Sequence, residues 1–408
     1  MELRAGYKQT ELGLIPQEWE VGSIGDTFRL VNGSAFKPVD WKQSGTPIIR
    51  IQNLNDPFAP FNYSQLPVPE RNRVETGDLL FAWSGTIGTS FGARVWAGPS
   101  GVLNQHIFKV HIDERLITIP FALLVFGQVE EHIAKQAHGF KASFVHVKKA
   151  DLVKVRLPIP RLVEQRAITA TLSDVDGLLG GLDRLIAKKR DLKQAAMQQL
   201  LTGQTRLPGF AGEWVAKPLG RVADIKSGGT PSTSQPHFWD GDVPWCTPTD
   251  ITALRGRKYL TNAARTISAT GLQASSAEVI APRSLIMTSR ATIGECAINL
   301  VPMTTNQGFK NLVPFAEIDV EFLYYLMTTQ KSGLIALCGG STFLEIGKKQ
   351  LIAYEVKLPQ ALPEQAAIAT ILSDMDTELT ALESRRDKTR ALKQAMMQEL
   401  LTGRTRLV

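Results

Sequence analysis

Cysteine is scarce in this chain of 408 residues, and its three copies, Cys246, Cys296 and Cys338, all lie in the second half. No two of them form a CxxC pair, and their number is odd. A disulfide framework and a cysteine zinc site are therefore not expected, which fits a reducing compartment. The start of the chain also lacks the apolar run of a signal peptide. We expect a cytoplasmic protein.

Long apolar runs are also missing. The longest, around Ile117 to Phe126, contains Pro120 and falls short of the ~20 residues that a bilayer requires. We therefore expect a soluble chain with no membrane span. Lys and Arg together number 46 against 39 for Asp and Glu. This small excess suggests an anionic partner but is too diffuse to identify one.

Motifs for catalysis are absent in the same way. We find no GxxxxGK[ST] or GxGxxG phosphate loop and no HExxH zinc motif. The Asn-Pro-Pro-Tyr or Asp-Pro-Pro-Tyr tetrapeptide of amino-methyltransferases is missing as well. Five of the six histidines lie in the first half and only His237 in the second, so they cannot build one site in both halves. We expect no catalytic site, no metal site and no cofactor on this chain.

What the sequence does contain is a duplication. Of the 44 positions from Glu164 to Leu207, 25 carry the same residue 200 positions later. Fainter matches precede this block, such as Thr86-Ile87-Gly88 with Thr292-Ile293-Gly294. Each unit therefore has a variable block of about 130 residues followed by a closely similar block of about 45.

The similar blocks have the spacing of long helices. Apolar residues step by four and three, as in an a/d heptad seam: Ile168, Leu172, Val175, Leu179, Leu182 and Ile186, then Ile368, Leu372, Met375, Leu379 and Leu382. Gly203 and Gly403 stand where C-terminal caps belong. We expect two antiparallel helices of about 40 residues, ~60 Å each. The seam should weaken near Lys189 and Arg386 and resume around Leu392 and Leu400.

Three glycines in the first helix, Gly177, Gly180 and Gly181, should weaken it locally. Close helix approach is the one reason we find for them.

The variable blocks read as mixed α/β lobes, because short apolar runs bounded by Gly and Pro alternate with helical spacing. The predicted fold class is α+β, with two lobes separated by two long antiparallel coiled-coil helices. The predicted segments are an N-terminal piece that closes a pseudo-twofold ring, a first lobe, a central helical spacer, a second lobe and a C-terminal helical spacer, at 1–25, 26–157, 158–220, 221–358 and 359–408.

Polar loops that correspond between the lobes differ in sequence, which favours recognition of two different targets. Arg, Gln, Asn, Ser and Thr reach base edges in DNA, whereas Lys holds phosphates. Turns with no binding role explain any single loop about equally well. The candidate DNA contacts are Lys37, Arg50, Trp83, Ser84, Thr86, Gln105, His106, Lys141, Ser143, Thr230, Ser232, Ser289, Arg290, Thr292, Gln307, Ser341 and Thr342.

The duplicated Glu-Gln, Leu-Ser-Asp-x-Asp, Leu-Lys-Gln-Ala and Leu-Leu-Thr-Gly-x-Thr-Arg-Leu segments resemble those of the specificity (S) subunits of type I restriction–modification systems. The Ile-Pro-x-Glu-Trp entry at 15–19 and the Thr-Ile-Gly and Asn-Gln signatures resemble them too. The resemblance covers essentially the whole chain. It implies two target-recognition domains, each reading half of a bipartite, asymmetric DNA site, with helices that set the gap.

The same resemblance implies partners. They are double-stranded DNA, two methyltransferase (M) subunits that carry S-adenosylmethionine and methylate adenine, and two restriction (R) subunits that use ATP and Mg. The S subunit itself would not be an enzyme. Candidate subunit contacts on the outward helix faces are Leu178, Leu185 and Arg385. Two other interpretations stay open: a coiled-coil adaptor with binding lobes, and the recognition module of a methyltransferase or nuclease fusion.

Overall fold

The computed structural model describes all residues except 1–4, 68, 138–143, 339–343 and 408. The chain forms two compact units. Unit 1 comprises Met1–Gly181 with Arg385–Val408, and unit 2 comprises Leu182–Ser384. Both unit borders fall inside the long helices, so the five segments proposed from the sequence repeat stay a prediction.

Unit 1 contains two four-stranded sheets. The first, in the order β10-β8-β12-β4, is antiparallel, and the second, in the order β6-β5-β11-β7, has β11 parallel to β5. Their strands are β4 (Phe28–Asn32), β5 (Thr46–Ile49), β6 (Asn62–Ser64), β7 (Arg73–Val74), β8 (Leu79–Ala82), β10 (Gly92–Val95), β11 (Gly101–Leu103) and β12 (Ile107–Ile112).

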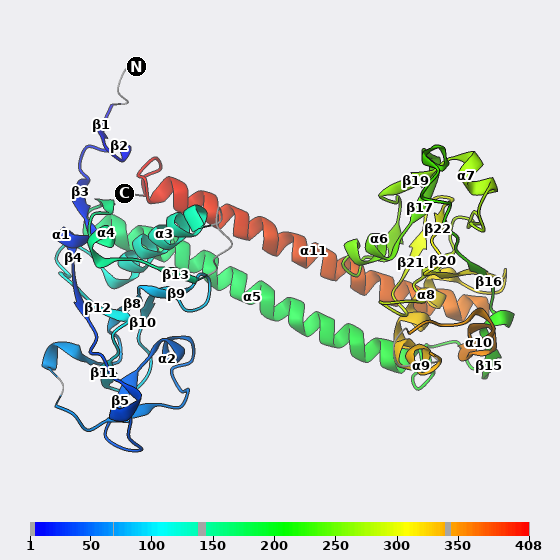
Figure 1. Ribbon diagram of the computed structural model, residues 1–408, viewed down its shortest axis with the longest axis horizontal. Coiled ribbons are helices and arrows are strands. Elements are labelled where there is room, and N and C mark those ends of the chain that lie inside the picture. Colours follow the sequence, from blue (N-terminus) through cyan, green and yellow to red (C-terminus); the bar gives the residue numbers. More distant parts are fainter. Residues whose placement is uncertain (1–4, 68, 138–143, 339–343, 408) are drawn as a thin grey trace. The chain divides into compact units, whose positions relative to one another are not determined.

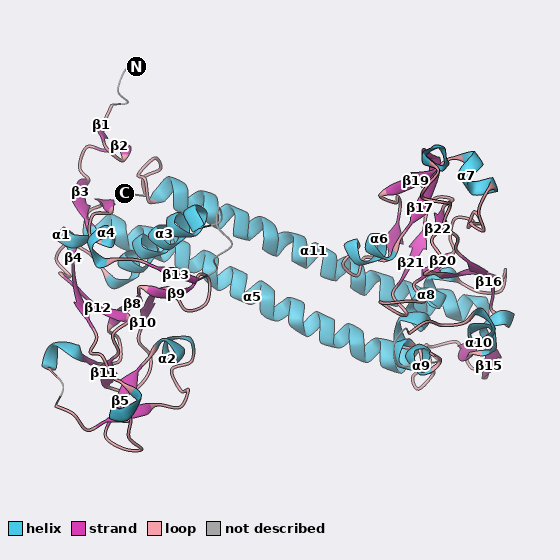
Figure 2. Cartoon of the chain, in the orientation of Figure 1, coloured by secondary structure: helices cyan, strands magenta, loops and turns pink. Residues whose placement is uncertain are grey.

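Three strand pairs and several helices complete unit 1 (Figure 2). The pairs join β1 (Tyr7–Thr10) with β2 (Gly13–Pro16), β3 (Glu20–Ser23) with β14 (Arg156–Ile159), and β9 (Ser84–Thr86) with β13 (Phe144–His146). The helices are α1 (Ile24–Thr27), α2 (Ile51–Asn55), α3 (Ile119–Ala137), α4 (Lys149–Leu152) and the 3-10 turns η1 (Pro38–Asp40) and η2 (Glu70–Asn72).

Unit 2 repeats this plan with a five-stranded and a three-stranded sheet, ordered β16-β23-β20-β21-β18 and β19-β17-β22, and the pair β15-β24. The strands are β15 (Trp214–Pro218), β16 (Ala223–Ser227), β17 (Trp239–Cys246), β18 (Tyr259–Leu260), β19 (Arg265–Ile267), β20 (Leu285–Met287), β21 (Cys296–Asn299), β22 (Thr304–Thr305), β23 (Lys310–Pro314) and β24 (Glu355–Pro359). The helices are α6 (Pro248–Ala253), α7 (Ala269–Gln273), α8 (Val320–Thr329), α9 (Lys331–Ala336), α10 (Lys348–Ala353), η3 (Leu219–Arg221) and η4 (Pro236–Phe238).

Two long helices, α5 (Leu162–Leu200) and α11 (Leu362–Leu400), carry the duplicated sequence (Figure 1). Each has 39 residues, which at 1.5 Å per residue makes it about 58 Å long. Gly203 and Gly403 follow the helix ends with φ of 71° and 69°. That left-handed backbone is the usual helix C-terminal cap and favours glycine, so the expected caps are confirmed.

In each unit a stretch of α5 lies antiparallel to a stretch of α11. In unit 1, Asp176 pairs with Lys393 at 2.6 Å and Glu164 pairs with Arg406 at 2.5 Å. The earlier residue of the first copy thus meets the later residue of the second copy. In unit 2 the pairs Lys189–Glu378 and Arg206–Glu364, both at 2.7 Å, follow the same order. The predicted antiparallel arrangement is confirmed within each unit.

The predicted seam holds in part. Ile168, Leu172, Leu182 and Ile186 are buried, as are Ile368, Leu372 and Leu379. The prediction that the seam resumes around Leu392 and Leu400 is wrong for Leu392, which is 57% exposed, and is confirmed for Leu400, which is buried. The neighbouring Lys393 turns toward the partner helix instead and pairs with Asp176, and Lys193 pairs with Asp376. Lysine–aspartate pairs therefore replace leucine in this stretch.

Near the start of each long helix, a buried glutamine forms hydrogen bonds to the rest of its unit. The Gln165 side chain accepts a hydrogen bond from the Thr118 backbone and donates to the carbonyl of Pro160. Gln365 bonds Asp319 and Pro359 in the same way. The helix starts also join the cores, because Ile168 and Leu172 pack in the aromatic core of unit 1 and Ile368 and Leu372 in that of unit 2.

The glutamate before each glutamine is also buried, and it joins sequence-distant segments. Glu164 accepts hydrogen bonds from the Trp19 indole, at 2.7 Å, and from the Arg406 guanidinium. The Tyr7 hydroxyl donates to the carbonyl of Gly403 at 2.9 Å. The N-terminal segment thus lies against the C-terminal residues, as the sequence led us to expect.

The second copy makes the same junction within one stretch of chain. Glu364 accepts two hydrogen bonds from Arg206, at 2.7 and 2.8 Å, and one from the Trp214 indole at 3.2 Å. Arg206 and Trp214 are close in sequence, whereas Arg406 and Trp19 come from opposite ends of the chain.

Replacing Glu164 tests the closure of unit 1. Glu164→Ala should lower the free energy of unfolding by about 3 kcal/mol, since it leaves the Arg406 charge and the Trp19 N–H without their buried acceptor. Glu18→Ala is the matched control, because this half-exposed carboxylate lies 3.9 Å from Arg406 and should contribute less than about 1 kcal/mol. Urea denaturation compares the two. Equal losses for both variants would contradict the role of Glu164.

The helix glycines generate a second prediction. A Cβ added at Gly177 or Gly181 would meet nothing within 4 Å in unit 1, so close helix approach does not explain these two positions. Gly177→Ala and Gly181→Ala should therefore each stabilise the chain, by up to about 1 kcal/mol, because alanine restricts the unfolded chain and favours the helix. Thermal unfolding measures this effect, and a lowered midpoint would show that a partner surface needs the open positions.

Candidate nucleic-acid interface

Unit 1 gathers several of the predicted residues around Trp83, which follows β8. The Trp83 indole donates to Asn32 Oδ1 at 3.1 Å. Its ring lies 5.2 Å from that of His106 and 4.7 Å from that of His146. Phe108 stacks against it at 5.8 Å. One aromatic side chain therefore holds two imidazoles, from β13 and from the turn before β12, at defined positions.

A small cavity of about 280 Å³ adjoins this cluster and is lined by Arg50, Gln52, Asn104 and His106 with two isoleucines. The Arg50 guanidinium lies 4.6 Å above the Trp41 ring and donates to Asn62 Oδ1 at 2.6 Å. Its direction is thus fixed before any ligand binds. Hydrogen-bond donors and acceptors that converge on one cavity are what reading a base edge requires.

The remaining predicted residues of unit 1 are more scattered. Lys37 is exposed, Gln105 extends beside His106 at 3.3 Å, and Thr86 pairs with Phe144 in a short ladder. Ser84 is only 5% exposed, which argues against direct base contact by its hydroxyl. Lys141 and Ser143 lie outside the described residues.

In unit 2, two tryptophan side chains form hydrogen bonds to the backbone of the loop after β16. The Trp245 indole donates to the Gly229 carbonyl at 2.9 Å, and the Trp239 indole donates to that of Ser232 at 3.1 Å. Thr230 then donates to the side chain of Gln307, so two predicted residues meet. The Arg265 guanidinium lies 4.0 Å above Trp239. This surface offers hydroxyl, amide and guanidinium groups together.

A second polar group in unit 2 centres on Arg290. Its guanidinium pairs with Glu345 at 2.9 Å, and Lys310 Nζ lies 3.9 Å from the same carboxylate. Burial lowers the pKa of Lys310. The Glu345 carboxylate opposes this shift, and the positive charges of Arg290 and Lys348 add to it. Two cations, Arg290 and Lys310, therefore share one carboxylate, and this excess of positive charge attracts anions.

Other predicted residues of unit 2 need correction or lie outside the described part. Ser289 is fully buried, and its backbone bonds Gly308 and Ile346, so it supports the loop from inside and does not face a ligand. Thr292 follows Ala291, whose φ of 55° is left-handed and marks a tight turn. Ser341 and Thr342 are not among the described residues.

The two units differ where their backbones correspond. In unit 1 β13 pairs with β9 so that His146 faces Ser84, and in unit 2 a similar bridge sets Glu345 opposite Arg290. One unit thus has an imidazole opposite a hydroxyl where the other has a carboxylate opposite a guanidinium. Such a shared backbone with different side chains suits two different targets.

Several residues of this interface were not predicted from the sequence: Gln52, Asn62, His146, Arg265, Lys310 and Glu345. Most are single polar residues in or beside short strands, where the spacing gives no signal. Asn104 and Asn306 could have been found, since they precede Gln105 and Gln307 in the matching Asn-Gln pairs of the repeat. Asn306 Oδ1 accepts from the Gly308 backbone and so shapes its loop.

The structure offers little for catalysis. Gly88–Gly92 has the G-x-S-x-G form of a nucleophile elbow, but Ser90 Oγ accepts a hydrogen bond from the Thr86 backbone in a turn between two strands. An elbow requires a strand-to-helix turn. Burial raises the pKa of Cys296 to about 12, which keeps that thiol protonated.

Metal and membrane signals are equally absent where the chain is described. Among those residues, no group of three or more His, Cys, Asp or Glu side chains is placed to hold a metal ion. Within the same part of the chain, no helix combines the length and apolar character needed to cross a membrane.

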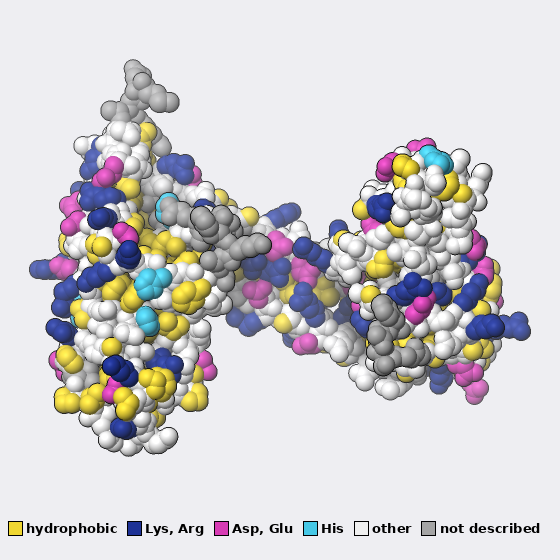
Figure 3. Space-filling view, in the orientation of Figure 1, with side chains coloured by type: hydrophobic (Ala, Val, Ile, Leu, Met, Phe, Trp, Pro, Cys, Tyr) yellow, Lys and Arg dark blue, Asp and Glu magenta, His cyan; other side chains and the backbone are white. Residues whose placement is uncertain are grey.

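The long helices expose the three residues predicted to contact other subunits. Leu178 and Leu185 are 45% and 39% exposed, and Arg385 is exposed too. Figure 3 shows basic and acidic side chains intermixed along these helices. No patch of one sign covers the visible helical surface, so the exposed leucines stand out against a mixed charged background.

Comparison with known proteins assigns the chain to a family. The model of the type I restriction modification DNA specificity domain matches residues 16–186 and again 211–390. The chain belongs to this family. Each match contains one variable block and part of one long helix. We call the parts of these matches that precede the helix, residues 16–161 and 211–361, the first and second specificity domains.

Named relatives agree. The chain is 24% identical to the putative type I restriction enzyme MjaX specificity subunit of Methanocaldococcus jannaschii, over 98% of this chain and 97% of that one. It is 38% identical to the MjaIX specificity subunit of the same organism, but over only 40% of this chain and 38% of that protein. It is 27% identical to the EcoR124I/EcoR124II specificity subunit of Escherichia coli, over 54% and 56%.

Solved structures share the fold. The S subunit of a type I restriction–modification system from M. genitalium has a TM-score of 0.55 at 16% identity, with 98% of both chains covered. A chain from a study of complex assembly and conformational transition of the type I R-M system has a TM-score of 0.63 at 20% identity, covering 95% of this chain and 99% of that one. The expected fold class, mixed α/β lobes with long helices, is confirmed.

Proposed function

We propose that this chain is the DNA-sequence-recognition subunit of a type I restriction–modification complex and is not itself an enzyme. The observation that carries the proposal is the duplication of one specificity domain with different polar groups at corresponding positions. Relatives that match along nearly their whole length are named as specificity subunits. The described residues that could touch DNA bind and orient, and none forms a nucleophile–base pair.

Each specificity domain would read one half of a bipartite, asymmetric site. In the first domain the readers are Arg50, His106 and their neighbours in the 280 Å³ cavity, and in the second they are Arg290, Thr230 and Gln307. Half-site centres on one face of a duplex lie about one helical turn apart, ~34 Å or about 10 base pairs. The rigid helices α5 and α11 would set that gap.

The chemistry would reside on partners. Two M subunits with S-adenosylmethionine would methylate adenine, and two R subunits with ATP and Mg would cut the DNA. Leu178, Leu185 and Arg385 are the proposed contacts for M subunits, since they are exposed on the helices. With +7 over 408 residues, isolated binding should be weak and salt-sensitive, because few phosphates can be neutralised.

Methylation mapping tests this function. Sequencing that detects modified bases, applied to DNA from cells carrying the complete system, should reveal one asymmetric motif of two halves with a fixed gap. Cells in which only this chain is deleted should lose the modification entirely. A motif that persists without the chain, or one that is continuous, would contradict the proposal.

Arg290→Ala should damage recognition of one half-site only. Loss of one Arg–base contact costs about 1–3 kcal/mol, so we expect roughly ten- to hundredfold weaker binding of the mapped site by the complex. The fold should change little, because Arg290 and Glu345 are an exposed pair. Binding is measured by fluorescence anisotropy at fixed salt.

Lys331→Ala is the control for Arg290→Ala. Lys331 forms an equally exposed pair with Glu295, at 2.7 Å in the same unit, but lies outside the proposed interface. Its removal should leave binding unchanged. Equal losses for both variants would reduce the role of Arg290 to general charge.

A further inference from the structure

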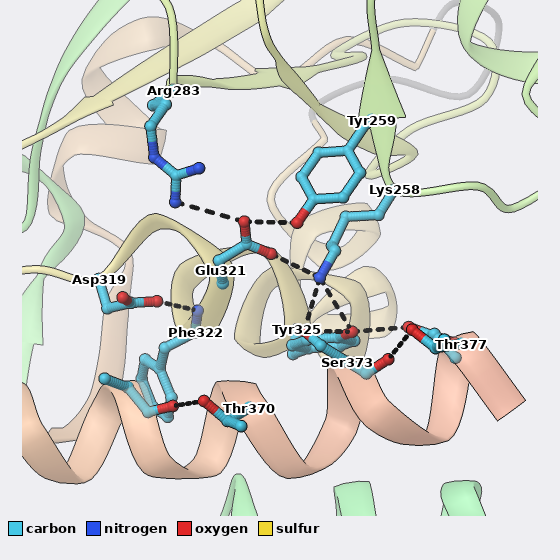
Figure 4. A network of polar contacts seen from close by, with 12 residues as sticks. Lys258, Tyr259, Arg283, Asp319, Glu321, Phe322, Tyr325, Thr370, Ser373 and Thr377 are labelled. Atoms are coloured by element: carbon cyan, nitrogen blue, oxygen red, sulfur yellow. Dashed lines mark hydrogen bonds and ion pairs between the residues drawn. The ribbon is translucent and has the colours of Figure 1, made fainter.

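A chain of polar contacts connects the second specificity domain to α11 (Figure 4). Lys258 lies directly before β18, and only 8% of its side chain is exposed. Its ammonium is 2.5 Å from Glu321 Oε2 on α8 and 2.7 Å from Ser373 Oγ on α11. One buried cation thus touches both the domain and the long helix.

Further contacts extend the chain of bonds in both directions. On the domain side, the Tyr259 hydroxyl donates to Glu321 at 2.7 Å. On the helix side, the Tyr325 hydroxyl donates to Asp376 Oδ2 at 2.6 Å, and Asp376 pairs with Lys193 of α5. The domain, α11 and α5 are therefore linked by one network, which we call the Lys258 network: Lys193, Lys258, Tyr259, Glu321, Tyr325, Ser373 and Asp376.

Close packing joins α8 to α11, where Leu323 and Tyr325 share a buried core with Leu372, but it does not extend to the loop that carries Lys258. A cavity of about 1350 Å³ opens between the Arg255–Thr261 loop and the two long helices, and Lys193, Lys258 and Asp376 all line it. Apolar contacts hold without a preferred direction, whereas charged hydrogen bonds constrain distance and angle. Beside this open cavity, the directional contacts of Lys258 hold the Arg255–Thr261 end of the domain at a set distance from the helices.

The first specificity domain lacks the counterparts of Glu321 and Tyr325, although the Asp176–Lys393 pair repeats the helix part of the network. Gln165 and Gln365 bond the backbones of Thr118 and Asp319, which aligns the two copies at this point. Counting on from there, Pro120 stands in place of Glu321 and Leu124 in place of Tyr325. Leu124 packs against the apolar core of unit 1.

A buried ion pair seldom adds stability over an apolar pair of the same shape, because both charges lose their hydration. The network therefore gives the second domain little that the leucine of the first domain would not. What it does add is a defined geometry between the reading surface and the helices.

We propose that Lys258 is a positioning residue that fixes the orientation of the second specificity domain on the long helices. This inference rests on the proposed function, since orientation matters only if the helices set a gap between half-sites. The second half-site is then read at a fixed angle to α11, and a DNA gap of the wrong length cannot be accommodated by tilting this domain.

The test measures gap preference in the complete complex with Lys258→Met. Duplexes carry the mapped half-sites with the natural gap, or with one base pair more or fewer. Changes in coupling residues shift such preferences by about three- to thirtyfold. We expect the variant to lose that much of its preference for the natural gap, and Lys258→Arg to recover most of it.

Lys109→Met is the matched control. Lys109 is another poorly exposed lysine, 2.6 Å from Asp78 and bonded to the Arg73 carbonyl, so its contacts stay within the first domain. Its loss should lower stability and overall affinity but leave the gap preference intact. A merely structural role for Lys258 would give this same result, and an unchanged gap profile in Lys258→Met would overturn the proposal.

Tyr325→Phe covers the case in which Lys258→Met does not fold, because it removes only the hydroxyl that bonds Asp376. It should also lower the preference for the natural gap, and an unchanged preference in this variant overturns the proposal as well. Failure of the proposed function is distinguishable, since the wild-type complex would then show no gap preference at all.

Discussion

Two buried carboxylates, Glu164 and Glu364, hold the structure together. Each accepts hydrogen bonds from an arginine that follows one long helix and from a tryptophan that opens a specificity domain. Both glutamates are almost fully buried, at 1% and 2% exposure. A buried charge is tolerable only with such partners, so helix start, helix end and domain entry must come together at each junction.

The two junctions share the same glutamate, arginine and tryptophan contacts, but the chain reaches them in different ways. At Glu364 the arginine and tryptophan belong to one short connection, whereas at Glu164 they belong to opposite ends of the chain. The fold is thus closed covalently on one side and by hydrogen bonds on the other. This closure explains why a duplicated sequence can form two similar units although one of them is assembled from both termini.

With the scaffold held at the junctions, the domains are free to differ in their loops. The core residues and the Glu-Gln pairs are shared, while the polar groups at Trp83 and at Arg290 have different chemistry. Loops on a rigid scaffold can change without loss of the core, and recognition residues accordingly gather there. The Lys258 network adds that the two domains also differ in how firmly they are fixed to the helices.

The sequence predicted the long helices, their antiparallel packing and the contact between the chain ends, because heptad spacing and close repetition are strong signals. It failed at Leu392, where a lysine–aspartate pair takes the inward position, since spacing alone cannot rank apolar burial against ion pairing. It also failed at Ser289, whose burial depends on strands distant in sequence. The Lys258 network was invisible for the same reason: its members span 193 to 376.

Circular permutation tests the closure most directly. A short Gly-Ser linker would join the present ends, and new ends would open at Gly209, so that Glu164 gains the covalent connection and Glu364 loses it. Gly209 lies in the connection between α5 and β15, between the two Glu364 partners. If the junctions are equivalent, the permuted chain should unfold within about 3 °C of the original, a difference of roughly 1 kcal/mol or less. A chain that fails to fold, or that melts far lower, would show that the Glu364 junction depends on its covalent connection and would contradict this account.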